Sequence, residues 1–547
     1  MWGLHAKNPR ARAQACMSPI AAAEKEPRPA SGSSGTERTM FNNAKHNYNS
    51  VGLAMATILS LLFIFVASGF VFSSASPGTK CAMLIGGAFF LIGAVQPHRM
   101  LVLMVPITFY LDEVKRLLII GGKTGLQDVT SVLAIAPVGA MGIILGCILR
   151  RIFFRRRPEP AERIIFVSAI AVFVAFGGME AFTVGDPLQA LRYAANSTVY
   201  FLLPWALLQC FRTREEIERF LRFCVLVGVP VALYGIWQYL FGLSDFEISY
   251  LQSGLTSTAT NLEDIRPRPF STLGSAHAFS NVMAFMLALS VHFTGPSARG
   301  RSRWKANLVV IIYALALVFS LGRGAIFVGM GMIVFAKLFR SKTGVMIAYS
   351  FSAVVLGGMI LFAQKVQDAM DKLQAFLPSS SDWQMQAFRL GTFSDRLTGY
   401  QNVLANPSSW PLFANPLKFR VTDTTQADAE FSHDIFSQML LRLGAVPVFM
   451  GAAVAIYFLW RAHRSVLELP MGKDGIRPLA ARLMAIVVVF LLSHAAGSGI
   501  TVFPMNFWTG IFVGLLCVIC LHLQKRNPKA PKGGDASVPA HATTGIA

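Results

Sequence analysis

Charged residues are scarce in this sequence. They make up only 14% of the 547 residues, against 54% hydrophobic residues, and the mean hydropathy is +0.52. A chain this long and this apolar cannot enclose its apolar side chains in one core that faces water on all sides. The composition therefore excludes a soluble globular protein and predicts a membrane protein.

Cysteine is also rare, with seven residues, and none of them falls in a long predicted outer loop. No disulfide framework is implied. Cys517 and Cys520 form a C-x-x-C pair in the apolar last predicted helix, without a second pair or a nearby histidine to complete four metal ligands. We therefore expect two packed thiols there and no metal site.

Several motifs of energy-driven and hydrolytic membrane proteins are missing. The sequence has no G-x-x-x-x-G-K-[ST] loop, no H-E-x-x-H motif and no internal repeat. Their absence argues against an ATP-driven pump or a membrane metalloprotease. We expect chemistry that needs no nucleotide and no cofactor.

Long apolar runs, by contrast, recur along the whole chain. Roughly 17 to 25 apolar residues are needed to cross a bilayer as a helix. The sequence therefore predicts an all-α polytopic bundle of about 12 to 14 transmembrane helices, with one long periplasmic loop that contains short helices. The predicted spans lie near 51–72, 80–96, 100–118, 129–149, 163–182, 190–211, 220–241, 279–293, 307–321, 324–338, 344–363, 435–460, 482–497 and 503–523.

The net charge of +21 and the pI near 10 would indicate nucleic-acid binding in a soluble protein. With the N-terminus placed inside, however, Lys and Arg concentrate in the inner segments, whereas Asp and Glu slightly outnumber them outside. This asymmetry follows the positive-inside rule. It predicts both termini in the cytoplasm, a multi-pass protein of a bacterial inner membrane, and no nucleic-acid partner.

The same reading divides the chain into three parts. Residues 1–50 form a cytoplasmic tail that we expect to be disordered, residues 51–523 the membrane domain, and residues 524–547 a cytoplasmic C-terminal tail. Two outer segments, 242–278 and 364–433, are long enough to hold a site. The second begins with an amphipathic helix that either lies along the outer membrane surface or packs on its own bundle.

Arginines mark the first outer segment and the following outer turn. Arg266 and Arg268 stand between prolines in RPRPFSTLGSAHAFSN, residues 266 to 281, where they could clamp a diphosphate or reach lipid headgroups. Arg323 lies in SLGRGAIF, at a tight outer turn between two apolar helices. A charge at that depth is a functional candidate, and a turn anchor is the alternative.

The second outer segment carries a further arginine and a histidine. Arg396 begins a short amphipathic helix, and His433 follows Ser432, a plausible N-cap, at the junction with the next predicted helix. A histidine there is either a hydrogen-bonded structural residue or a general base. Asp434 could orient His433, and His277 is a possible supporting residue in the clamp segment.

Taken in order, these blocks resemble the O-antigen ligase family, which includes related oligosaccharide polymerases. The matching elements are Arg-x-x-[GS]-T before a helix, S-x-G-R-G, and an outer-loop arginine followed by a histidine and an L-x-x-x-G helix, over roughly residues 190 to 520. The sequence departs from the family where Asp434 replaces a common asparagine and where PLFANP replaces a glycine-rich turn.

The resemblance implies transfer of a glycan from undecaprenyl diphosphate to an acceptor hydroxyl at the periplasmic face, without metal or nucleotide. Arg268, Arg396 and His433 fall on the family's functional positions, with Arg266, Arg323, His277 and Asp434 as substrate-binding candidates. The acceptor would be lipid A core for a ligase or another lipid-linked glycan for a polymerase, and membrane lipids surround both substrates. The alternatives are a transporter or flippase of lipid-linked oligosaccharide and a scaffold without catalysis.

Overall fold

The structure is a computed structural model, and it describes residues 76–120, 126–153, 159–183, 196, 198–253, 268–294, 301–361, 365, 372, 411–413, 439–440, 444–471, 476–494 and 502–523. By its internal contacts the chain divides into Met1–Thr57 and Ile58–Ala547. All described residues belong to the second unit.

The described residues form helices joined by turns and contain no strand, which confirms the predicted all-α class. The elements are α2 (Pro77–Val95), α3 (Pro97–Ile120), α4 (Leu126–Leu133), α5 (Ile135–Phe153), α6 (Pro160–Thr183), η1 (Val199–Leu202), α8 (Leu203–Cys210), α9 (Arg214–Phe241), α10 (Asp245–Gln252), α11 (Ala276–Phe293), α12 (Arg301–Phe319), α13 (Arg323–Leu338), α14 (Lys342–Leu361), α20 (Ala445–Glu468), α21 (Arg477–His494), α22 (Met505–Val518) and η5 (Ile519–Leu523).

Five helical segments within the described ranges are long and apolar enough to cross a membrane: Pro77–Val95, Asp128–Phe153, Arg214–Phe241, Ala276–Phe293 and Ala445–Glu468. This finding agrees with a multi-pass membrane protein. The predicted total of 12 to 14 spans stays a prediction, because several helices are shorter or less apolar and the first predicted span, 51–72, lies outside the described residues.

Some predicted boundaries shift in the structure. The predicted span 435–460 corresponds to α20, which begins at Ala445 and runs on to Glu468. The span 129–149 is divided between α4 and α5 at residue 134. Most of the outer segment 364–433, including its predicted amphipathic helix, lies outside the described residues.

Local sequence explains where the helices begin. At the start of α9, Thr213 Oγ1 accepts a hydrogen bond from the backbone N–H of Glu216 (3.3 Å), and the Glu216 carboxylate accepts one from the N–H of Thr213 (3.2 Å). This capping box satisfies N–H groups that have no partner within the helix. The capping box therefore sets the start of α9, directly after the basic turn.

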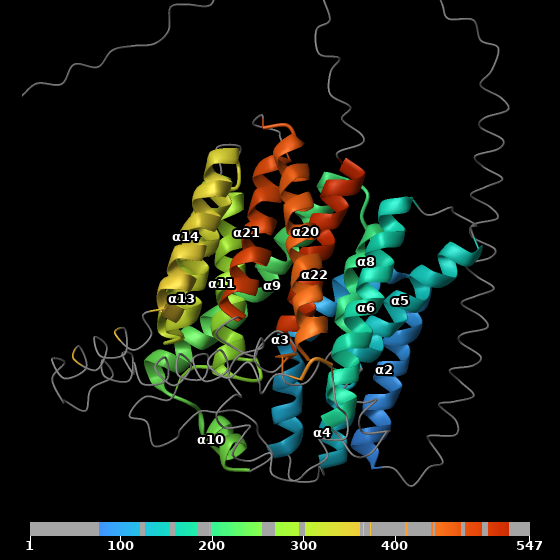
Figure 1. Cartoon of the computed structure of the whole chain (residues 1–547). Coiled ribbons are helices and arrows are strands. Elements are labelled where there is room, and N and C mark those ends of the chain that lie inside the picture. The colour runs from blue at the N-terminus through green and yellow to red at the C-terminus, as the bar shows by residue number, and fades with distance from the viewer. Residues whose placement is uncertain are drawn as a thin grey trace, which may run out of the picture. The chain divides into compact units, whose positions relative to one another are not determined.

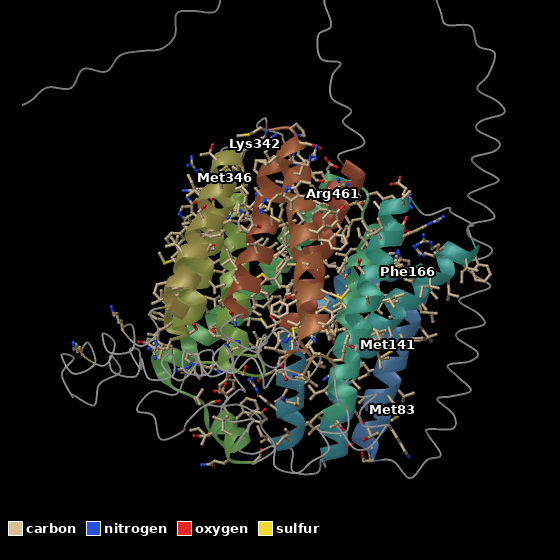
Figure 2. All side chains as sticks on the ribbon, in the orientation of Figure 1. Met83, Met141, Phe166, Lys342, Met346 and Arg461 are labelled. Atoms are coloured by element: carbon tan, nitrogen blue, oxygen red, sulfur yellow. The ribbon has the colours of Figure 1, made fainter. Side chains whose placement is uncertain are left out.

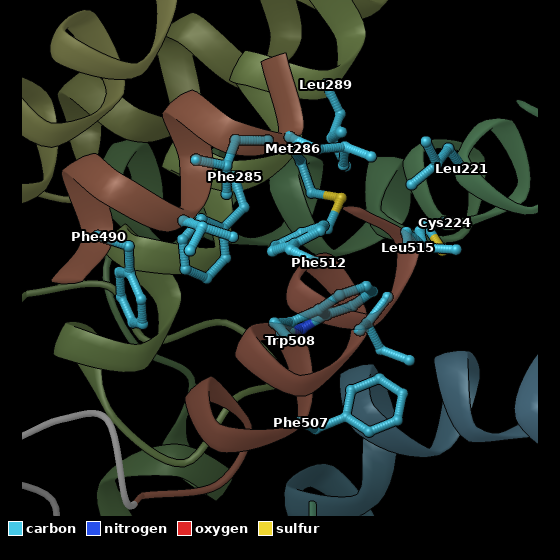
Figure 3. Close-up of a cluster of buried hydrophobic side chains, with 14 of the residues drawn as sticks. Leu221, Cys224, Phe285, Met286, Leu289, Phe490, Phe507, Trp508, Phe512 and Leu515 are labelled. Atoms are coloured by element: carbon cyan, nitrogen blue, oxygen red, sulfur yellow. The ribbon is translucent and has the colours of Figure 1, made fainter. Parts of the chain in front are cut away.

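The hydrophobic core runs through most of the described helices, and one part of it, between α11, α21 and α22, is rich in aromatic side chains (Figure 3). Phe285 contacts Phe490 and Phe512 edge to face, with ring centroids 4.7 and 5.3 Å apart, and Trp508 stacks on Phe512. In a bilayer such interdigitation holds helices together by packing, because lipid tails are as apolar as the side chains. The aromatic core therefore fixes the position of α11, which carries the candidate site at its start.

The two ends of the bundle can be told apart by the helices that reach them (Figure 1). Helix α10 and the C-terminal end of α3 lie at one end, which we call the α10 end. Figure 2 shows Met83 toward that end and Lys342 and Arg461 toward the other, which we call the basic end. Under the positive-inside rule the α10 end is the predicted outer face.

Candidate functional site

The candidate site is built around the turn 268–275, which precedes α11 at the α10 end. Arg116, near the end of α3, is fully buried and holds this turn: its guanidinium donates to the backbone carbonyl groups of Ser271 and Leu273 and to the Glu113 carboxylate, at 2.8 Å. The guanidinium carbon also lies 4.3 Å from the ring centroid of Phe270. A residue 155 positions away in sequence thus fixes the turn.

A second polar group holds the same turn from α9. The side-chain oxygen of Gln238 accepts hydrogen bonds from the backbone N–H groups of Phe270 (3.1 Å) and Ser271 (2.7 Å), and its NH₂ group donates to Glu247. Glu247 on α10 also accepts from Tyr234 Oη at 2.9 Å. Buried polar groups this completely paired specify one arrangement of their neighbours.

The two hydroxyl side chains of the turn complete its anchoring. Ser271 Oγ donates to the carbonyl of Val231 at 2.7 Å, and Thr272 Oγ1 donates to the carbonyl of Phe109 at 2.6 Å. Ser271 has a φ of +52°, a conformation that costs a non-glycine residue free energy and persists where the surroundings determine it. The turn is therefore a fixed platform at the start of α11.

Arg268, His277 and Arg323 are the predicted site residues that fall within the described ranges. Arg268 is exposed and leads directly into the anchored turn. His277 is exposed in the first turn of α11, and its Nε2 lies 3.1 Å from Nδ2 of the buried Asn281. Ser275, the N-cap of α11, accepts a hydrogen bond from the N–H of Ala278 (3.1 Å).

The Arg323 turn packs against the same end of α11. Gly322, the residue before α13, approaches α11 so closely that a Cβ there would lie 2.6 Å from the Cβ of Ser280. Ser280 in turn donates to the carbonyl of His277 at 3.0 Å. The turn that carries the half-buried Arg323 and the first turn of α11 that carries His277 are thus brought together.

The described part of the long outer segment contacts the start of α20. The N–H of Ala445 donates to the carbonyl of Pro411 (2.7 Å), and that of Val446 to the carbonyl of Leu412 (3.1 Å). Gly444 has a φ of +91°, and a Cβ on it would lie 2.6 Å from the Cα of Phe413. The segment PLF, residues 411–413, therefore packs against Gly444, directly before α20.

The other predicted site residues, Arg266, Arg396, His433 and Asp434, lie outside the described residues. Their predicted roles stay predictions. His292 lies near the C-terminal end of α11, at the end of this helix away from His277.

Sequence reasoning missed the polar residues that hold the turn, which are the buried Arg116, Gln238 and Glu247 and the half-buried Glu113. Beside them, Lys115 pairs with Asp112 at 3.0 Å. A signal was present, because the motif LDEVKR interrupts an apolar run, and charges in such a run mark function or internal pairing. Within the described residues, no group of three or more His, Cys, Asp or Glu side chains is arranged to hold a metal ion.

Comparison with known proteins adds no assignment to this geometry: no family model matches the chain, and no curated protein matches it. The site itself offers guanidinium groups, an exposed imidazole and a rigid backbone platform at one end of the bundle. This set is suited to binding an anionic group presented at a membrane surface.

Proposed function

We propose that this protein is a membrane glycosyltransferase that transfers a glycan from undecaprenyl diphosphate to an acceptor hydroxyl at the periplasmic face of a bacterial inner membrane. It would act as an O-antigen ligase or as an O-antigen or exopolysaccharide polymerase. The observation that carries the proposal is that the turn with Arg323 packs on the first turn of α11. Arg268 lies just before the anchored turn that leads into this helix.

In the proposed reaction the protein mainly neutralises the charge of the leaving diphosphate and positions the acceptor. The acceptor hydroxyl attacks the anomeric carbon as the bond from that carbon to the diphosphate oxygen breaks, and the diphosphate leaves with increased negative charge. Arg268 and Arg396 would neutralise that charge, and His433 would take the hydroxyl proton. Arg266, Arg323, His277 and Asp434 would bind substrate or orient His433.

The anchored turn supports the role of Arg268. Arg116 and Gln238 fix the backbone at residues 270–273, so the segment that carries Arg268 would need little rearrangement when the diphosphate arrives. Preorganised donors stabilise developing charge because they do not have to reorient during the reaction.

A transporter or flippase of lipid-linked oligosaccharide is the second candidate. Such proteins place paired charges or broken helices near the middle of the membrane. The pairs Asp112–Lys115 and Glu113–Arg116 instead lie near the end of α3, at the α10 end. This placement favours surface chemistry over passage through the bundle.

The test is the chain-length profile of surface and undecaprenyl-linked glycans in a deletion strain complemented with wild type or with His433→Ala. Long chains that stay on the carrier indicate a ligase, and single repeat units indicate a polymerase. Profiles identical to wild type in both the deletion strain and the variant contradict glycan transfer.

A further inference from the structure

A groove of about 380 Å³ lies between α5, α6 and α8, away from the candidate site. Ile148, Arg151 and Ile152 line it from α5, and Arg163, Phe166 and Val167 line it from α6. Each set follows the i, i+3, i+4 spacing of one helix face. Trp205 of α8 lies 4.8 Å from Phe166 between ring centroids and completes the lining.

The groove is apolar along its length and basic where α5 ends and α6 begins. Ile152 and Val167 are 63% and 64% exposed, so the groove opens onto the outward surface of these helices, where Phe166 is labelled in Figure 2. Ile164 and Val174 extend this exposed apolar surface along α6. Within a membrane this surface would face lipid.

The two arginines of the groove differ in their partners. Arg151 donates to Glu162 at 3.1 Å, and its guanidinium carbon lies 5.8 Å from the Trp205 ring centroid; Glu162 also accepts from Gln209. The exposed Arg163 has no side-chain ion pair within the described residues. Among the described residues, this end of the groove thus holds one arginine that is paired with a carboxylate and one, Arg163, that is not.

We propose that this groove is a binding site for an anionic phospholipid of the leaflet at the basic end. The Arg163 guanidinium would bind the headgroup phosphate, Arg151 would add a second donor, and an acyl chain would lie on Ile148, Phe166 and Val167. Basic pockets between helices on the cytoplasmic side are suited to acidic headgroups. The proposal requires a membrane-embedded chain and is independent of the proposed glycan transfer.

Lipid retention by the purified full chain tests the proposal. The protein in neutral detergent is mixed with dioleoyl phosphatidylglycerol or dioleoyl phosphatidylcholine, and native mass spectrometry counts the retained lipids. Wild type should retain phosphatidylglycerol preferentially, Arg163→Gln should weaken that retention about fivefold, and Arg163→Lys should restore most of it. The matched control is Arg461→Gln, which removes an exposed arginine on α20 at the same end and should leave retention unchanged.

Two further arms separate the lipid from its headgroup. Val167→Trp fills the groove and should lower retention of both lipids, which an effect of charge alone would not do. Glycerol 3-phosphate at the concentration of the lipid should not displace it. Equal retention by Arg163→Gln and Arg461→Gln, wild-type retention by Val167→Trp, or displacement by glycerol 3-phosphate would each overturn the lipid site. Thermal unfolding of each variant identifies any that fails to fold, and if Arg163→Gln fails, Val167→Trp carries the test.

Discussion

The two ends of the bundle use their charged side chains differently. At the α10 end, the buried Arg116 donates to the half-buried Glu113 and to the turn before α11. The buried Glu247 accepts from Gln238, which holds the same turn. At the basic end, Arg477 and Arg482 donate to the carbonyls of Leu469 (2.7 Å) and Ala288 (2.8 Å), toward the ends of α20 and α11.

The buried Arg116 thus fixes a turn, whereas Arg477 binds a carbonyl group where α20 ends. Cations near helix C-termini meet the negative end of the helix dipole and its unpaired carbonyl groups. Such arginines stabilise the helix ends. At the α10 end, Arg116 instead holds one turn, as is expected where a substrate must be held in a fixed geometry.

Among the substitutions considered, Arg116→Ala should have the largest effect on stability. The substitution leaves the Glu113 carboxylate and two carbonyl groups of the turn without their buried partner, so we expect a loss of about 3–5 kcal/mol in the free energy of unfolding. Unfolding in mixed detergent micelles measures it, with Arg461→Ala as the exposed control. Equal stability of the two variants would show that the buried network does not hold the turn.

Arg268→Ala should lower the rate of transfer without lowering the stability of the protein. Because Arg268 is exposed, we expect near wild-type unfolding, together with a loss of glycan transfer of about 10²- to 10³-fold if the guanidinium stabilises the leaving diphosphate. Quantified surface glycan in the complemented deletion strain gives the activity. Wild-type transfer by this variant would remove Arg268 from the chemistry.

Gln238→Leu removes the amide that holds the turn from α9. Two buried backbone N–H groups and Glu247 lose a partner, and each unsatisfied group costs about 1–3 kcal/mol. We expect faster amide hydrogen exchange at Phe270 and Ser271, measured by mass spectrometry of peptides that cover residues 268–275. Unchanged exchange there would indicate that Gln238 does not hold the turn.

Gly322→Ala and Gly324→Ala form a matched pair on either side of Arg323. A Cβ at Gly322 would collide with Ser280, whereas a Cβ at Gly324 would meet no atom within 4 Å. We expect Gly322→Ala to lose about 1–3 kcal/mol through overpacking, with reduced transfer, and Gly324→Ala to resemble wild type. Equal unfolding midpoints and equal transfer for the pair would mean that the contact with α11 does not position Arg323.

The smallest effect is expected for Arg464→Ala at the basic end. Arg464 and Glu468 are exposed partners 3.5 Å apart on α20, and exposed pairs contribute about 0.2–1 kcal/mol. The unfolding midpoint should therefore change little. A loss as large as that of Arg116→Ala would contradict the contrast between the two ends.

Apolar run length predicted the helices well, because a run of that length has few other solutions in a bilayer. Even α3, which the charges of LDEVKR interrupt, extends from Pro97 to Ile120. Helix boundaries were harder to predict. Helix α20 starts ten residues after the predicted 435, at Gly444–Ala445, where the start depends on contact with Pro411 and Leu412 rather than on local hydropathy.

The candidate site was predictable only where a local motif carries it. Arg268, His277 and Arg323 stand out from their neighbours in sequence, and the structure places all three at the α10 end. The roles of Arg116 and Gln238 depend on contacts with Ser271 across 155 and 33 residues, which no local spacing encodes. Long-range polar pairing is set by how the helices pack, so it becomes visible only in the folded chain.

The most direct test of the proposed function is transfer by purified protein in liposomes that contain an undecaprenyl diphosphate-linked glycan and an acceptor. We expect wild type to release undecaprenyl diphosphate and to elongate the acceptor. Transfer by Arg268→Ala should be slower by about 10²- to 10³-fold, and transfer by Gly324→Ala should be unchanged. Movement of the intact lipid-linked glycan across the bilayer without bond cleavage, or equal transfer by wild type and Arg268→Ala, would contradict the proposed function.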